Sequence, residues 1–193
     1  MLSVVVLISG SGSNLRALLE AADNPLYPAK VVAVGSDVPA DGLAHADQFG
    51  VPTFVVNPKA FASREAWADM LLANINHFKP DLVVLAVFMR ILPANFVQAM
   101  SPNLINTHPS LLPAFPGAHA VRDALSAGAK TTGVTVHVVD EGVDTGPQLA
   151  QREVQVEDND TEAALHERIK VVERELLVDV VRQIAEQKLQ LSA

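Results

Sequence analysis

Apolar residues along the chain follow two alternating kinds of pattern. Short runs rich in Val, Ile and Leu, such as Ser3 to Ser9, are typical of strands that are buried on both faces. Longer segments repeat apolar residues at the spacing of an amphipathic helix. Strands are predicted over 3–9, 30–35, 53–56, 81–86, 104–108, 132–139 and 148–156. Helices are predicted over 15–22, 40–49, 63–78, 93–100, 118–127 and 161–188.

This alternation of strands and helices predicts an α/β fold. Parallel strands joined through helices form right-handed crossovers, with helices on both faces of the sheet. We therefore expect a doubly wound, mostly parallel sheet of Rossmann-like type and a long C-terminal helix. The 193 residues fit a single domain over 1–193, and no linker or internal repeat divides them.

Ligands in such sheets bind beyond the carboxyl ends of the strands. Three segments fall at that edge: Gly10 to Asn14, Phe88 to Leu92, and the residues from His108 onward. The glycines of the first segment permit a tight turn, and a helix follows, so its amides are placed to cradle a phosphate. It lacks the Lys of a Walker loop and the third glycine of the dinucleotide fingerprint. A plain strand-to-helix turn is the alternative.

Candidate catalytic residues gather at the end of the strand 104–108. Asn106 and His108 are two positions apart and therefore point to the same face. The prolines that follow end the strand. Taken singly, His108 fits a buried strand-end histidine and Asn106 a turn former. A third candidate, Asp144, lies in the acidic loop 140–147, whose spacing differs from the EF-hand pattern, so we expect no metal.

The last helix carries one charge within its apolar stripe. A carboxylate at Glu173 needs a partner there. One interpretation is an ion pair within the core, with Arg16 or Lys170, and the other is an acid that faces a ligand. The apolar members of the stripe are Leu165, Ile169, Val172, Leu176, Leu177, Val180 and Ile184.

Composition narrows the classes of function. The net charge of −8 argues against a nucleic-acid-binding surface. The chain has no cysteine, which excludes disulfides and thiolate metal sites. The apolar run 2–9 is too short to span a membrane and lacks the basic leader of a signal peptide. We expect a cytoplasmic protein without nucleic-acid or membrane partners. The sequence leaves its oligomeric state open, a homodimer included.

Four segments together make the chain resemble the family of folate-dependent glycinamide ribonucleotide formyltransferases. The block Asn-x-His-Pro-Ser-Leu-Leu-Pro and the downstream Asp are shared more widely among enzymes that use 10-formyltetrahydrofolate. The phosphate-type loop after the first strand and the chain length favour the glycinamide member. The matching segments are 8–14, 88–92, 106–113 and 140–147.

The resemblance implies transfer of a formyl group from 10-formyltetrahydrofolate, a co-substrate, to the amine of 5′-phosphoribosylglycinamide in purine biosynthesis. It assigns the N-terminal half to phosphate binding and the C-terminal half to folate binding and catalysis. The implied catalytic residues are Asn106, His108 and Asp144. The implied substrate-binding residues are Ser11, Gly12, Ser13, Asn14 and Glu173. The implied folate-binding residues are Arg64, Met89, Arg90, Ile91, Leu92, Val139, Asp140, Glu141 and Val143.

The chemistry of direct attack by an amine fits this trio. Negative charge grows on the formyl oxygen, where the Asn106 amide and a protonated His108 supply donors, and Asp144 supports the charged imidazole. No enzyme nucleophile is needed. Two positions depart from the family: Val87 and Ala114 stand where relatives often have Gly and Lys. We expect Val87 to narrow the folate pocket and Ala114 to remove a charge near it.

Several alternatives share parts of this pattern. Formyltetrahydrofolate deformylase has a similar trio, with water in place of the amine, but usually carries an additional regulatory domain. Formyl transfer to an aminoacyl-tRNA or a nucleotide sugar needs more chain and, for tRNA, a basic surface. A nucleotide-binding or regulatory module without chemistry is the alternative outside the enzymes, and the complete trio argues against it.

Overall fold

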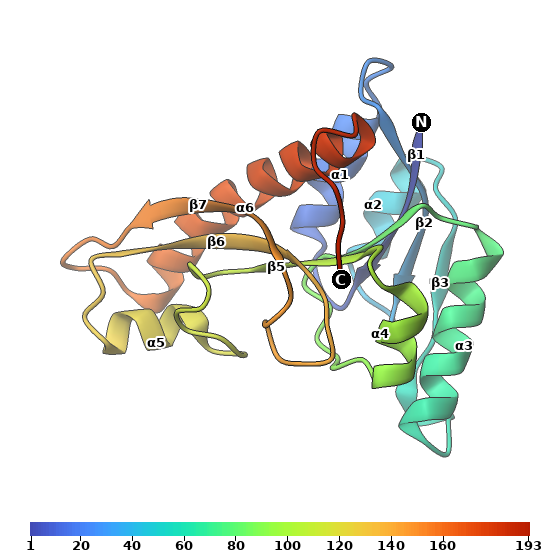
Figure 1. The fold of residues 1–193 in the computed structure, drawn as a ribbon, viewed down its shortest axis with the longest axis horizontal. Coiled ribbons are helices and arrows are strands. Elements are labelled where there is room, and N and C mark those ends of the chain that lie inside the picture. The colour runs from blue at the N-terminus through green and yellow to red at the C-terminus, as the bar shows by residue number, and fades with distance from the viewer.

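Seven strands form one sheet in the computed structural model of the chain, which describes all residues 1–193 (Figure 1). Their order is β3-β2-β1-β4-β5-β6-β7. The five strands β1 to β5 run parallel, and β6 and β7 add an antiparallel edge. The predicted doubly wound, mostly parallel sheet is confirmed. The strands are β1 (Leu2–Ile8), β2 (Ala29–Ser36), β3 (Thr53–Val55), β4 (Leu82–Leu85), β5 (Leu104–His108), β6 (Thr131–Val138) and β7 (Gln148–Gln155).

Five α-helices and one short 3₁₀ helix lie between the strands, and a sixth α-helix follows the last strand. α3 and α6 begin at side-chain caps, because Ser63 and Thr161 accept the backbone N–H groups three residues ahead. α6 ends three residues earlier than predicted, where Gln187 adopts a left-handed φ of 58°. None of the helices is long and apolar enough to cross a bilayer. The bounds are α1 (Ser13–Ala22), α2 (Leu43–Gln48), η1 (Pro58–Ala60), α3 (Arg64–His77), α4 (Ala94–Met100), α5 (Ala120–Ser126) and α6 (Glu162–Ala185).

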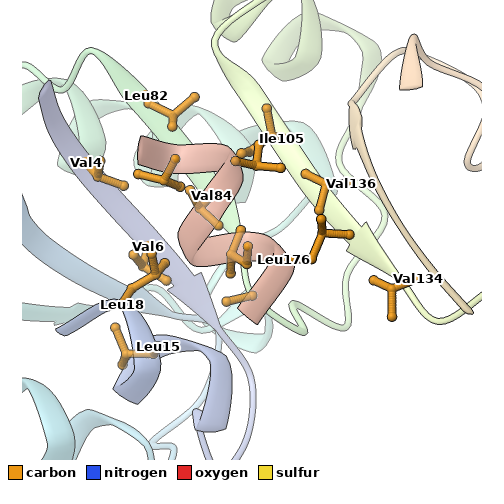
Figure 2. Packing of buried hydrophobic residues seen from close by; sticks show 14 of the residues in the cluster. Val4, Val6, Leu15, Leu18, Leu82, Val84, Ile105, Val134, Val136 and Leu176 are labelled. Carbon is orange, nitrogen blue, oxygen red and sulfur yellow. The ribbon is translucent and has the colours of Figure 1, made fainter. Parts of the chain in front are cut away.

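Two apolar cores lie on the two faces of the sheet. In β1, Val4 and Val6 face the core formed with α1, α5 and α6, whereas Val5 and Leu7 face the core formed with α3 and α4. Figure 2 shows the first core, in which strand residues such as Val84 and Ile105 surround a stretch of α6 that carries Leu176. Burial on both faces explains why the parallel strands read as continuous apolar runs.

The second core stops short of the antiparallel edge. It contains no residue of β6 or β7, so α3 and α4 do not cover this part of the sheet. On this face of β5, Asn106 and His108 follow Leu104, the one β5 residue of the second core. On β6 the same face carries Thr135 and His137, which alternate with buried valines. The topology therefore concentrates polar groups at the end of the parallel sheet.

Candidate active site

The carboxyl ends of three parallel strands meet at one edge. After β1, the Ser9 hydroxyl accepts the Met89 N–H, 2.8 Å away, from the loop after β4. After β2, Asp37 accepts from Arg90 Nε at 2.6 Å. Asp37 is 2% exposed, so this buried carboxylate holds a side chain of the predicted folate segment. Sequence reasoning missed Asp37, although its position directly after a parallel strand marks the same edge.

Asn106, His108 and Asp144 converge, together with a second histidine. His108 Nδ1 lies 3.4 Å from Asp144 Oδ2, and His137 Nε2 lies 3.6 Å from Asp144 Oδ1. Asn106 pairs with His137 across the β5–β6 ladder, and its Nδ2 is 3.5 Å from His137 Nε2. Asp144 thus bridges two histidines, one from each strand.

The loop 140–147 reaches His108 because of its own turn chemistry. Asp140 Oδ1 accepts both the Gly142 N–H and the Thr145 hydroxyl, which folds the segment back on itself. Gly146 permits the return, since a Cβ there would lie 1.8 Å from the Val138 carbonyl oxygen. Asp144 Oδ2 then accepts the Gly117 N–H at 2.8 Å, which joins this loop to the proline-rich loop after β5.

The Asp144 carboxylate is ionised at neutral pH. The hydrogen bond from His137 is the largest cause that lowers the pKa of Asp144, from 3.8 to about 2, and the Gly117 N–H and the charge of His108 lower it further against the effect of burial. A fixed negative charge therefore faces both imidazoles.

His137 was missed by sequence reasoning. Its Nδ1 is 3.0 Å from the Val138 carbonyl oxygen, which only accepts, so Nδ1 carries the hydrogen. When the imidazole is neutral, Nε2 accepts a hydrogen bond from Asn106. When the imidazole is charged, Nε2 donates to Asp144. The available signal was the i, i+2 spacing of Thr135 and His137 in the strand beside Asn106.

His108 lies behind the cavity wall rather than on it. The residue is 5% exposed, and its Nε2 is 2.8 Å from the Phe115 carbonyl oxygen. Both ring nitrogens therefore face oxygen acceptors, an arrangement that suits the doubly protonated imidazole.

Two neighbouring cavities contain all nine residues predicted to bind folate. The first, of about 120 Å³, is also lined by Asn106, His137 and Asp144. The second, of about 540 Å³, lies within the usual range for small organic ligands. Arg90 and Ile91 line both cavities. The first cavity also holds Leu92, Val139, Asp140, Glu141 and Val143, and the second holds Arg64 and Met89.

The glycine-rich loop after β1 ends in a left-handed turn. Gly12 has φ 71° and stands at the N-cap of α1 without a side-chain cap, so the first amides of the helix stay available. Arg16 N–H, which donates to the Gly12 carbonyl, is the first amide bonded back to this turn. A left-handed residue ahead of a helix start makes a concave set of N–H groups suited to an anion.

Glu173 is buried without a cation. It is 4% exposed, and its Oε1 accepts from Asn14 Nδ2 at 3.0 Å and from the Thr107 hydroxyl. The first of the two interpretations, a core ion pair with Arg16 or Lys170, is wrong, because Arg16 pairs with Glu20 and Lys170 pairs with Glu167. Glu173 connects α6 with the phosphate-type loop and with β5.

Comparison with known proteins shows the family of the chain. The family model described as formyl transferase matches residues 2–181. The chain belongs to the formyl transferase family. It is 53% identical to a phosphoribosylglycinamide formyltransferase of Mycobacterium tuberculosis, over 94% of this chain and 84% of that protein. It is 40% identical to the Escherichia coli protein of the same name, over 98% and 90%. A crystal structure of glycinamide ribonucleotide transformylase 1 from Symbiobacterium toebii superposes with TM-score 0.96 at 40% identity, covering 100% and 92%.

Val87 and Ala114 are the two positions that depart from the expected family pattern. Val87 lies outside both cavities, so the expected narrowing of the folate pocket is wrong. Instead Val87 has φ 60°, a conformation that favours Gly and strains a β-branched residue. Ala114 is exposed, and its carbonyl accepts the Ser110 hydroxyl. No group of three His, Asp or Glu residues is close enough to hold a metal ion, and the absence of a metal stays a prediction.

Val87→Gly is expected to raise the melting temperature by about 1 to 3 °C. Relief of left-handed strain is worth about 1 to 2 kcal/mol, against roughly 0.5 to 1 kcal/mol for the added freedom of the unfolded chain. Thermal unfolding followed by circular dichroism measures the shift. Val171→Gly, at an exposed position within α6, is the control and should lower the melting temperature. A lower value for Val87→Gly would contradict the strain.

Proposed function

We propose that the chain is a phosphoribosylglycinamide formyltransferase that transfers the formyl group of 10-formyltetrahydrofolate to the amine of 5′-phosphoribosylglycinamide in purine biosynthesis. The convergence of Asn106, His108 and Asp144 beside the two cavities carries the proposal. The names of the relatives support it. Membership of the formyl transferase family fits transfer to an amine rather than the hydrolysis of a deformylase.

The phosphoribosyl end of the substrate is proposed to bind at the start of α1. The open amides of Ser11, Gly12 and Ser13 and the positive end of the helix favour a phosphate. Asn14 and Glu173, joined by their hydrogen bond, lie next to this loop. A buried carboxylate without a cation is suited to accept from hydroxyl or N–H groups of the substrate.

The folate is proposed to occupy the two cavities, with the pterin in the one that Asn106 and Asp144 line. The second cavity has Arg64 and Arg90 on its wall and suits the carboxylates of the glutamate tail. Arg64 also donates to the Ile91 carbonyl at 3.1 Å through Nε, so its guanidinium is held at the entrance.

The chemistry assigned to the trio is a direct transfer. The amine nitrogen bonds to the formyl carbon, the bond from that carbon to the folate nitrogen breaks, and the proton lost by the amine is balanced by one gained by the folate nitrogen. Asn106 Nδ2 and His108 Nε2 donate to the oxyanion, and His108 also delivers the proton. The free protein satisfies His108 Nε2 with the Phe115 carbonyl, and the formyl oxygen takes over this hydrogen bond. Asp144 stabilises the charged imidazole.

The decisive experiment is to mix the protein with 10-formyltetrahydrofolate and follow tetrahydrofolate formation with and without phosphoribosylglycinamide. Strict dependence on the amine is expected. Equal rates in its absence would indicate a hydrolase and would contradict the proposal.

Gly12→Val is expected to raise the KM for phosphoribosylglycinamide at least about 10-fold and to leave the KM for the folate nearly unchanged, because the turn that aims the amides is disrupted. A Cβ at Gly12 would lie 3.0 Å from Gly42 Cα. Gly50→Val is the matched control, because Gly50 has φ 67° but open space around it. Equal changes in both KM values would indicate a structural turn instead of a phosphate site.

A further inference from the structure

Thr107 lies between the two candidate catalytic residues of β5 but points to the opposite face of the sheet. Asn106 lines the cavity, whereas the Thr107 hydroxyl donates to Glu173 Oε1 on α6. Thr107 is 7% exposed, so this hydrogen bond is shielded from water. The catalytic strand is therefore connected directly to the buried carboxylate of α6.

The same carboxylate oxygen receives a second hydrogen bond from the other end of the site. Asn14 Nδ2, in the first turn of α1, donates to Glu173 Oε1 at 3.0 Å. Glu173 Oε2 accepts no hydrogen bond from the chain. It is not fully buried, so it keeps contact with solvent. One oxygen is thus saturated, and the other is left for a ligand.

Two donors are needed because a carboxylate rotates easily. The terminal torsion of a Glu side chain is broad and roughly two-fold, so a single donor leaves the plane of the carboxylate poorly determined. Donors from α1 and β5 converge on Oε1 from two elements and fix that plane. A fixed Oε2 distinguishes ligands by where their donor groups lie.

We propose that Thr107 is a positioning residue, which holds Glu173 so that Oε2 accepts a hydrogen bond from a hydroxyl or N–H group of phosphoribosylglycinamide. This inference rests on the proposed function. It assigns to Thr107 a part in selecting that substrate, whereas its neighbours Asn106 and His108 act on the formyl group.

Thr107→Val tests the role, because it removes the hydroxyl with little change in volume. Without the Thr107 hydroxyl, Oε2 is no longer held in place, and its hydrogen bond to the substrate is lost or weakened. Because a hydrogen bond to a charged group is worth about 10-fold to 100-fold in affinity, the KM for phosphoribosylglycinamide should rise by about 10-fold or more. The KM for 10-formyltetrahydrofolate and kcat should stay within about 3-fold. Thr107→Ser keeps the hydroxyl and should restore the KM. Thr132→Val is the matched control, because the Thr132 hydroxyl is buried without any partner, and its loss should leave all three constants unchanged.

A double-mutant cycle with Glu173→Gln shows whether Thr107 acts through Glu173. Thr107→Val should add little in the Glu173→Gln background if the two residues form one unit. Additive effects, a rise of both KM values together, or failure of Thr107→Ser to restore the KM would overturn the proposal. Thr107→Ala replaces Thr107→Val if the latter does not fold. A wild-type protein without amine-dependent turnover contradicts the proposed function itself, whereas an active wild type with an unchanged KM in Thr107→Val contradicts only the role of Thr107.

Discussion

Asp144→Asn is expected to lower kcat by about 10²-fold to 10⁴-fold, the usual contribution of general acid catalysis. Asp144 faces His108 at 3.4 Å and His137 at 3.6 Å, so its loss withdraws the charge that supports a protonated imidazole. Oxyanion stabilisation and proton delivery should weaken together. The two KM values should change much less, because the carboxylate acts mainly in the transition state. Steady-state kinetics with each substrate varied in turn measures the effect.

The substitution suits this test because it leaves the backbone unstrained. Asp144 has φ 55°, a conformation that Asn adopts as readily as Asp. Asp158→Asn, at an exposed acid paired with Lys130, removes the same charge elsewhere and should be neutral. A kcat of Asp144→Asn within about 3-fold of the wild type would exclude Asp144 from the mechanism.

The same carboxylate makes the stability of the protein depend on pH. The pKa of Asp144 is about 2 in the folded protein against its ordinary value of 3.8, so the unfolded chain binds the proton more tightly. The stabilisation, about 2 kcal/mol, is fully present above about pH 5 and is lost as the pH falls toward 2. Thermal unfolding of wild type and Asp144→Asn should therefore differ most near neutral pH and converge near pH 2. A constant difference down to pH 2 would contradict this role.

Asn106→Ala is expected to lower kcat by about 10²-fold to 10³-fold, the usual loss when one preorganised oxyanion donor is removed. The Asn106 amide lines the cavity and contacts His137 at 3.5 Å, whereas the backbone of β5 holds its position. Asn95→Ala is the control, because this exposed amide of α4 contacts only the Asp69 carboxylate. A change confined to the KM for the folate would show that Asn106 binds the folate without stabilising the oxyanion.

Local chemistry predicted the elements well. The strand 104–108 was predicted with the bounds that β5 has, because an apolar run and two prolines define both of its ends. α2 was predicted from 40 and begins at Leu43, since the Asp41–Gly42 turn precedes it. The long last helix was predicted, but its end depends on the left-handed Gln187, a conformation that no apolar pattern encodes.

Candidate site residues could be predicted from the sequence where they lie on the same strand. Asn106 and His108 share a face through the two-residue period of β5 alone. His137 and Asp37 were missed because their importance comes from neighbours far along the chain, Asn106 and Arg90. Glu173 was correctly placed in the stripe of α6, but its partners Asn14 and Thr107 are neutral donors, whereas charge complementarity had suggested cations.

The sequence by itself determined which faces of each element are apolar and therefore which layers form, because periodicity is a local property of side chains. It also determined that three loop segments lie at one edge, since parallel strands present their carboxyl ends together. Only the tertiary structure decided the partners of each polar group: that Asp144 bridges two histidines and that Glu173 bonds two elements at once. Those contacts depend on the register of β5 against β6 and on loop closure, which join residues distant in sequence at distances of a few ångströms.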